Sequence, residues 1–143
     1  MTQNNIQSEP AVPNGFARHF RHSPVTDPRE PIYSKQADQK IMLGLRVRES
    51  HTNARGLAHG GLISALADNA MGLSCASQFV TPHSLLTVNL SIDFLGVAKI
   101  GDWLEFDTVF TKIGSTLCFA QAYITANSVT CAKASATFRA MPK

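Results

Sequence analysis

The chain has 143 residues, of which 44% are hydrophobic and 16% charged, and its formal net charge is +3. This length fits a single domain with a real core, and the small, scattered positive excess argues against a nucleic-acid partner. No uninterrupted apolar run reaches the ~18 residues of a membrane span, and no signal peptide is recognisable, so we expect no membrane partner either.

Residues 1–31 are predicted to be a partly irregular N-terminal arm, followed by one domain over residues 32–143. Five of the seven prolines lie in the arm. Within it, the stretch GFARHFRH (15–22) is expected to form a short helical turn that packs its phenylalanines on the domain. His19 and His22 have the spacing of one helix face, but a metal site would need further ligands nearby, so we predict no bound metal.

The domain is predicted to begin with a strand and to continue into one long helix. In KIMLGLRVRE (40–49), apolar residues occupy every second position, which is the period of a half-buried strand. The Gly-rich loop NARGLAHGG (53–61) leads into LISALADNAMGLSCASQFV (62–80), which is long enough for about five helical turns. Because this helix is apolar almost all round, we expect it to lie inside the protein.

Four further strands are expected after the helix, separated by short turns. The first, 86–94, alternates apolar residues with a polar face that holds Thr87, Asn89 and Ser91. The other three are 104–111, LCFAQAYIT (117–125) and TCAKASATFRA (130–140). Since nothing else in the chain can cover the helix, the sheet must wrap around it. The predicted fold is therefore α+β: a hotdog fold, in which an antiparallel sheet of five to six strands wraps around one long central helix.

The three cysteines, Cys75, Cys118 and Cys131, match the spacing of no zinc or redox motif. They are predicted to be reduced, partly buried thiols, which favours a cytoplasmic protein.

No Gly-x-Ser-x-Gly motif is present, which excludes a serine-hydrolase elbow, and no phosphate-binding loop occurs. We predict that the protein uses no cofactor.

Gly60 and Gly61 lie where the loop turns into the helix. The first N–H groups of a helix have no internal partner, and the helix dipole adds partial positive charge there. The absence of side chains lets a substrate approach this backbone closely. The pair therefore suits an anion or a carbonyl oxygen that becomes one during acyl transfer, although a tight packing turn would have the same sequence.

Asp68 is a lone carboxylate in the middle of an apolar, small-residue helix. It is the first charged residue after Arg55, and the next is Asp93. Burying an ionised carboxylate without a partner is very unfavourable. Either Asp68 caps a neighbouring loop or pairs with a distant cation, or it acts as a general base or nucleophile on an acyl carbon.

The spacing of these groups predicts a dimer. From Gly60 to Asp68 a helix rises about 12 Å, whereas the N–H donors and the base must both lie ~3 Å from one reacting group. One chain cannot satisfy both conditions with its own helix. If two helices lie antiparallel across a two-fold axis, Asp68 of one subunit can face Gly60 of the other, which gives two shared sites.

These residues resemble the signature of the PaaI-like hotdog acyl-CoA thioesterases. In that family an Asn precedes a Gly, then come His-Gly-Gly and an Asp in the central helix, followed by a small residue and Gly. The matching positions are Asn53, Gly56, His59, Gly60, Gly61, Asp68, Ala70 and Gly72. The segment TVNLSIDFLGVAKIGDWLE (87–105) is similar to the family's second strand and the turn after it. The resemblance covers roughly residue 33 to the end.

The resemblance implies hydrolysis of an acyl-CoA thioester. Gly60 would donate its N–H to the thioester carbonyl, and Asn53 would bind or orient near the same carbonyl. Asp68 would act as base or nucleophile from the opposite subunit, with Thr87 positioning the water. His59 would orient the loop or contact the leaving group. Such proteins are homodimers and often tetramers, and a tetramer is expected here.

Three further predictions concern the substrate and the competing activities. Gly61, Leu62 and Met71 are expected to bind the substrate, the last two as part of an acyl tunnel. A hotdog hydratase or dehydratase is the alternative enzyme, but it would need a His and a carboxylate acting on one carbon, and His59 is held in His-Gly-Gly. A non-catalytic acyl-CoA-binding hotdog protein is the other alternative.

Overall fold

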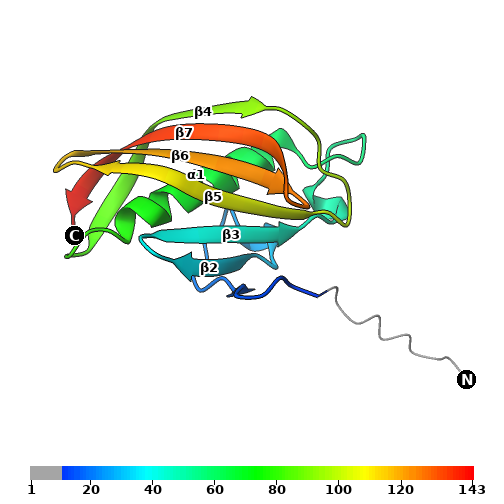
Figure 1. Cartoon of the computed structure of the whole chain (residues 1–143), viewed down its shortest axis with the longest axis horizontal. Coiled ribbons are helices and arrows are strands. Elements are labelled where there is room, and N and C mark those ends of the chain that lie inside the picture. The colour runs from blue at the N-terminus through cyan, green and yellow to red at the C-terminus, as the bar shows by residue number, and fades with distance from the viewer. Residues whose placement is uncertain (1–10) are drawn as a thin grey trace, which may run out of the picture.

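The computed structural model describes residues 11–143 as one helix held in a curled, seven-stranded antiparallel sheet (Figure 1). The strand order is β1-β2-β3-β5-β6-β7-β4, so β4 forms one edge. The bounds are β1 Ala17–Arg18, β2 Tyr33–Ala37, β3 Lys40–Arg46, α1 Gly60–Ala76, β4 His83–Phe94, β5 Trp103–Ile113, β6 Leu117–Ala126 and β7 Val129–Pro142, with short 3-10 helices η1 Asp27–Arg29 and η2 Glu49–His51.

This arrangement confirms the α+β hotdog fold, with one correction. The predicted count of five to six strands is too low, because β1 and β2 lie outside the five strands that the hydrophobic pattern identified. β1 is only two residues long, and it exists through its pairing with β2, Ala17 opposite Ser34. An alternation of apolar and polar residues, by which the other strands were predicted, cannot be recognised in two residues. The division into an arm and a domain stays a prediction.

The helix α1 is shorter at its C-terminal end than predicted and begins at Gly60. Its inner face carries Ile63, Leu66, Ala67 and other residues that join the core. Ser74 is fully buried in the same face, where its Oγ accepts from the N–H of Ile41 at 3.1 Å. The one buried hydroxyl on this face is therefore paired. No helix of the described residues is long and apolar enough to span a membrane.

The stretch GFARHFRH does not form a helical turn, and this prediction is wrong. Its backbone is extended where it pairs with β2, because strand hydrogen bonds replace the local bonds of a turn. Only one of its phenylalanines packs as expected: Phe16 meets Trp103 edge to face, with ring centroids 5.3 Å apart. Phe20 is 69% exposed.

A bulge in β4 overturns the expected polar face of that strand. The register against β7 shifts between Thr87 and Asn89, which inserts Val88 as an extra residue. One inserted residue reverses the faces of all residues beyond it. Thr87 therefore points to α1, as Leu90 and Ile92 do, while Ser91 lies on the outer face of the sheet.

All three cysteines are free and buried. Burial raises the pKa of Cys75 to about 12, with the nearby Cys118 adding to the effect. Burial also raises the pKa values of Cys118 and Cys131. These thiols stay protonated near neutral pH and are poor nucleophiles. The cytoplasmic location inferred from them stays a prediction.

Candidate active site

The start of α1 presents a backbone N–H, that of Gly60, which the described chain does not use. The N–H of Gly61 donates to Nδ1 of His59 at 2.8 Å, so His59 caps the helix. The N–H of Gly60 makes no hydrogen bond among residues 11–143. A Cβ at Gly60 would lie 3.2 Å from the ring of Phe94. The free donor lies at the positive end of the helix dipole and is suited to an anion or a polarised carbonyl.

The capping contact also defines the state of the His59 ring. Because Nδ1 accepts a hydrogen bond from Gly61, the neutral imidazole carries its proton on Nε2. The side chain is exposed, so Nε2 faces solvent or a ligand. This contact holds the end of the loop against the start of the helix. That His59 orients the loop for catalysis stays a prediction. A contact between His59 and the leaving group stays a prediction.

Asn53 organises the loop before the helix. Its Oδ1 accepts from the N–H of Arg55 at 2.9 Å and of Leu57 at 3.2 Å, and its own N–H donates to the carbonyl of Leu57 at 2.8 Å. The turn needs a positive φ at Gly56, which is +74°. The Nδ2 amide of Asn53 makes no hydrogen bond within the described chain, so it can serve a ligand. Asn53 does not line the cavity described below.

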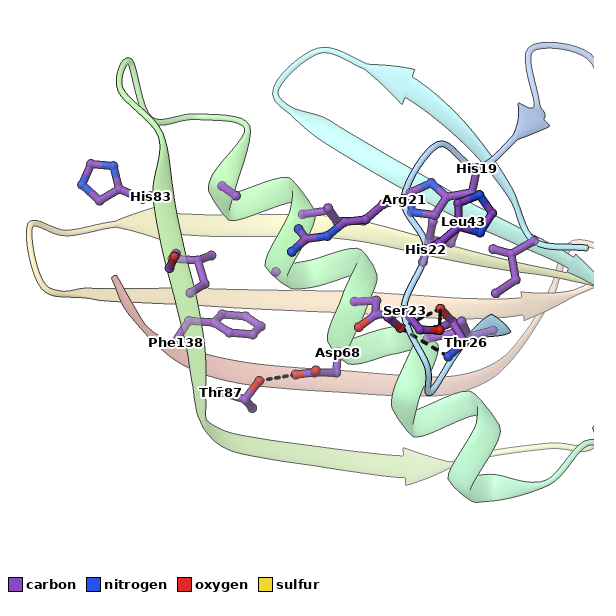
Figure 2. Close-up of a pocket in the computed structure, with 18 of the residues that line it drawn as sticks. His19, Arg21, His22, Ser23, Thr26, Leu43, Asp68, His83, Thr87 and Phe138 are labelled. Carbon is purple, nitrogen blue, oxygen red and sulfur yellow. Dashed lines mark hydrogen bonds between the residues drawn. The ribbon is translucent and has the colours of Figure 1, made fainter. Parts of the chain in front are cut away.

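Asp68 is paired with a hydroxyl and not with a cation. The Oγ1 of Thr87 donates to Oδ1 of Asp68 at 2.7 Å, across from β4 to α1 (Figure 2). Neither a lysine nor an arginine of residues 11–143 forms an ion pair with Asp68. The side chain is half-buried, and its Oδ2 accepts no hydrogen bond from the described residues. Pairing with a distant cation, one of the two structural explanations considered for this residue, is therefore not seen among the described residues.

A cavity of about 360 Å³ opens beside Asp68 and Thr87. This volume is at the lower end of the ~300–1,000 Å³ typical of small-molecule sites. Figure 2 shows its walls: α1 and β4 on one side and the N-terminal segment 19–26 on the other. None of the N-terminal lining residues was individually predicted as part of the site, although the arm was expected to contribute to an acyl tunnel. These lining residues are His19, Arg21, His22, Ser23 and Thr26.

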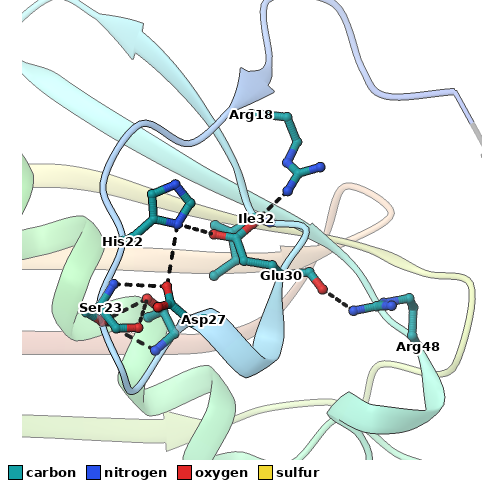
Figure 3. Close-up of polar contacts among 8 residues, drawn as sticks. Arg18, His22, Ser23, Asp27, Glu30, Ile32 and Arg48 are labelled. Carbon is teal, nitrogen blue, oxygen red and sulfur yellow. Dashed lines mark hydrogen bonds and ion pairs between the residues drawn. The ribbon is translucent and has the colours of Figure 1, made fainter.

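The N-terminal segment is fixed in place by polar contacts (Figure 3). Oε2 of Glu30 accepts from the N–H of Ile32 at 2.7 Å, and the guanidinium of Arg48 donates to the carbonyl of Glu30. Oδ1 of Asp27 accepts from the N–H of Ser23 at 3.2 Å. The cavity wall therefore has a defined position.

A buried histidine adds a second anchor for this segment. His51 is 1% exposed, and its Nε2 lies 2.9 Å from the carbonyl of Arg29. Burial lowers the pKa of His51, while the bond to Arg29 opposes this. Since Nδ1 of His51 accepts from the N–H of Arg48, the neutral ring donates from Nε2 to Arg29.

The other predicted substrate-binding residues lie apart from Asp68. Gly61 and Leu62 line a second cavity of about 330 Å³ together with His59 and His51. Leu66 lines both cavities. Met71 is fully buried in the core and lines neither. In a single chain, therefore, Asp68 and Thr87 form one group, and His59, Gly60 and Gly61 form another at the helix start.

Comparisons with known proteins point to one family. The model of the thioesterase superfamily matches residues 55–132. A Pseudomonas aeruginosa protein named "Putative esterase PA0474" is 41% identical over 128 residues, which is 89% of this chain and 96% of that protein. Mouse acyl-coenzyme A thioesterase 13 is 34% identical over 91 residues, 62% of this chain and 63% of the relative.

A solved structure agrees with these sequence matches. The crystal structure of a hypothetical thioesterase protein with coenzyme A from Streptococcus pneumoniae superimposes with a TM-score of 0.69 and 25% identity. The match covers 78% of this chain and 87% of the other.

Proposed function

The chain belongs to the thioesterase superfamily, and from this premise we propose that it hydrolyses an acyl-CoA thioester to the free acid and CoA. A relative named as an acyl-coenzyme A thioesterase and a similar structure with coenzyme A support this substrate class. The observation that carries the proposal is Asp68, a carboxylate that lines a cavity, accepts a hydrogen bond from Thr87 and has no cationic partner in the described part of the chain.

In the proposed reaction Asp68 supplies the carboxylate and Gly60 the electrophilic contact. As a general base, Asp68 takes a proton from water while the water oxygen bonds to the thioester carbon. The negative charge that develops on the carbonyl oxygen is stabilised by the Gly60 N–H. The C–S bond then breaks and the CoA sulfur takes up a proton. As a nucleophile, Asp68 would instead form an acyl anhydride that water later hydrolyses; both versions use the same groups.

Two copies of the chain are proposed to share each site. The helix rise from Gly60 to Asp68 is about 12 Å, too far for one substrate carbonyl to contact both within a single chain. Gly61, Ala65, Asp68 and Gly72 lie on one partly exposed face of α1, where a second helix can approach closely.

The edge of the sheet beside this face is also suited to pairing. β4 is an edge strand whose Leu86 and Val88 are 59% and 61% exposed. An exposed apolar edge strand favours association with another chain. A further association into tetramers through the sheet's outer face, where Phe110, Phe119 and Tyr123 are exposed, is part of the same proposal.

The alternative activities predict different products. A hydratase needs a His and a carboxylate at one carbon, whereas Nδ1 of His59 is engaged by Gly61 and no contact joins His59 to Asp68 in the described chain. A non-catalytic binder would hold acyl-CoA without releasing thiol. Incubation with a panel of acyl-CoAs, followed by thiol detection and product analysis, separates the three. We expect free CoA; a hydrated acyl-CoA, or tight binding without thiol, would reject the proposal.

Thr87 is proposed to position the Asp68 carboxylate and the attacking water. Replacing Thr87 with valine keeps the shape and removes the hydroxyl that donates to Asp68. We expect kcat to fall about tenfold with little change in KM, since a hydrogen bond to a charged group contributes about 1.5–3 kcal/mol and this one is partly exposed. Steady-state thiol release measures the effect.

The matched control is Thr87→Ser, which retains the hydroxyl and should recover most of kcat. If Thr87→Val and Thr87→Ser lose activity equally while both melt at the wild-type temperature, the hydroxyl does not act as proposed.

A further inference from the structure

The cavity beside Asp68 has a cationic wall that the proposed hydrolysis does not require. Its charged lining side chains are those of Arg21, Lys143 and Asp68, so Asp68 is the one acidic side chain among the described lining residues. Arg21 forms no ion pair within residues 11–143. Figure 2 shows its side chain extending from the N-terminal segment over α1. An arginine held beside a cavity without an acidic partner can bind a carboxylate with its planar donor array.

A second, independent feature of the same wall is an unpartnered buried imidazole. His19 lines the cavity and is 8% exposed, and its Nδ1 has no hydrogen-bond partner among residues 11–143. Burial lowers the pKa of His19, and the charges of His22 and Arg21 act in the same direction, although Glu30 opposes them. A polar side chain this buried normally has a partner, so His19 is an unsatisfied polar group in the wall that carries Arg21.

The cavity is also lined by apolar side chains. They are Leu43, Leu66, Leu73, Leu85 and Phe138. Methylene groups of an acyl chain can be buried against them. A chain that starts at a thioester beside Asp68 would therefore run over an apolar surface and end near a guanidinium.

We propose that this cavity selects acyl groups whose far end carries a carboxylate, with Arg21 as the specificity-determining residue. This inference rests on the proposed hydrolysis. The substrates would be CoA half-thioesters of dicarboxylic acids. The anchors at Asp27, Glu30 and His51 hold the segment in place, so Arg21 approaches the acyl end from a fixed wall. Coenzyme A also carries anionic groups, its phosphates, and the test must separate these two sources of negative charge.

Matched pairs of thioesters make that separation. We would measure kcat/KM for succinyl- and butyryl-CoA, glutaryl- and pentanoyl-CoA, and adipoyl- and hexanoyl-CoA. In at least one pair the dicarboxylic substrate is expected to be favoured about tenfold, the lower end for a charge-assisted hydrogen bond at a partly exposed site. Arg21→Gln should abolish this preference by lowering kcat/KM for the dicarboxylic member about tenfold more than for the neutral member. Arg21→Lys should retain part of it.

The control is Arg29→Gln, on the same segment but outside this cavity, which should leave the preference unchanged. An equal loss for both members in Arg21→Gln would show that Arg21 contacts the CoA portion, and would overturn the inference. So would the absence of any preference in the wild-type protein.

Binding of non-hydrolysable CoA thioethers with the same chains provides a readout that does not depend on catalysis. If no thioester is hydrolysed but the carboxylated thioether binds about tenfold more tightly, and only when Arg21 is present, the hydrolysis fails and the inference about the cavity stands. If hydrolysis occurs but neither rate nor binding distinguishes the pairs, only the inference fails.

Discussion

Replacing Asp68 with asparagine is expected to lower kcat for acyl-CoA hydrolysis by about 10²-fold or more, because positioned bases and nucleophiles contribute at least this much. Asparagine has nearly the same shape and still accepts the hydrogen bond from Thr87 through its amide oxygen. It cannot take a proton from water or attack the acyl carbon. Since the substrate contacts of the cavity remain, KM should change little. Thiol release from a reactive acyl-CoA measures both constants.

The matched control for this substitution is Asp38→Asn, which removes an exposed carboxylate near the β2–β3 turn, away from the cavity. It should retain wild-type kcat. If Asp68→Asn or Asp68→Ala releases thiol at the wild-type rate, Asp68 has no catalytic role, and the contact with Thr87 is purely structural.

Replacing Gly60 with proline is expected to lower kcat by about 10²–10³-fold, the range found when one oxyanion donor is removed. Proline is favoured at the first position of a helix, where its missing N–H leaves no helical bond unmade. The preceding residue, His59, already has φ −68° and ψ 132°, which is the conformation that a following proline requires. The substitution therefore removes the one N–H proposed to contact the thioester carbonyl.

Gly60→Ala is the control, because it adds a Cβ in the same place and keeps the N–H. That Cβ would lie 3.2 Å from the Phe94 ring, so a small loss from packing is expected in both variants. The difference in kcat between Gly60→Pro and Gly60→Ala therefore measures the effect of losing the N–H donor. Equal activity of Gly60→Pro and Gly60→Ala, with both helices intact by circular dichroism, would show that the Gly60 N–H does not stabilise the transition state.

Local patterns were sufficient to predict the main elements of the fold. The strand over 40–49, the single helix and the four later strands all follow from hydrophobic period and turn residues, and the structure has each of them. The bulge at Thr87 could not be predicted, because Thr87, Val88 and Asn89 continue a regular alternation and only the register against β7 reveals the extra residue. β1 depends on a distant partner strand in the same way.

The residues of the candidate site also fall into those that the sequence pattern predicts and those that only the fold reveals. Asn53, His59, Gly60 and Asp68 belong to one continuous segment, so their spacing along the chain is enough to group them as a candidate site. The cavity wall that carries His19 and Arg21 is formed by the N-terminal segment, which is distant in sequence from α1 and β4. It reaches the cavity only because the chain before β2 folds back over α1, and this path depends on polar anchors that no local pattern predicts.

The most direct test of the shared site combines the two inactive variants in one dimer. Asp68→Ala and Gly60→Pro chains, carrying different affinity tags, would be co-expressed and the mixed dimer purified through both tags. Such a dimer keeps one intact site, built from Asp68 of one copy and Gly60 of the other, so thiol release should recover to about half of the wild-type rate. If the mixed dimer is as inactive as each variant alone, both groups act within a single chain, and the shared-site account is wrong.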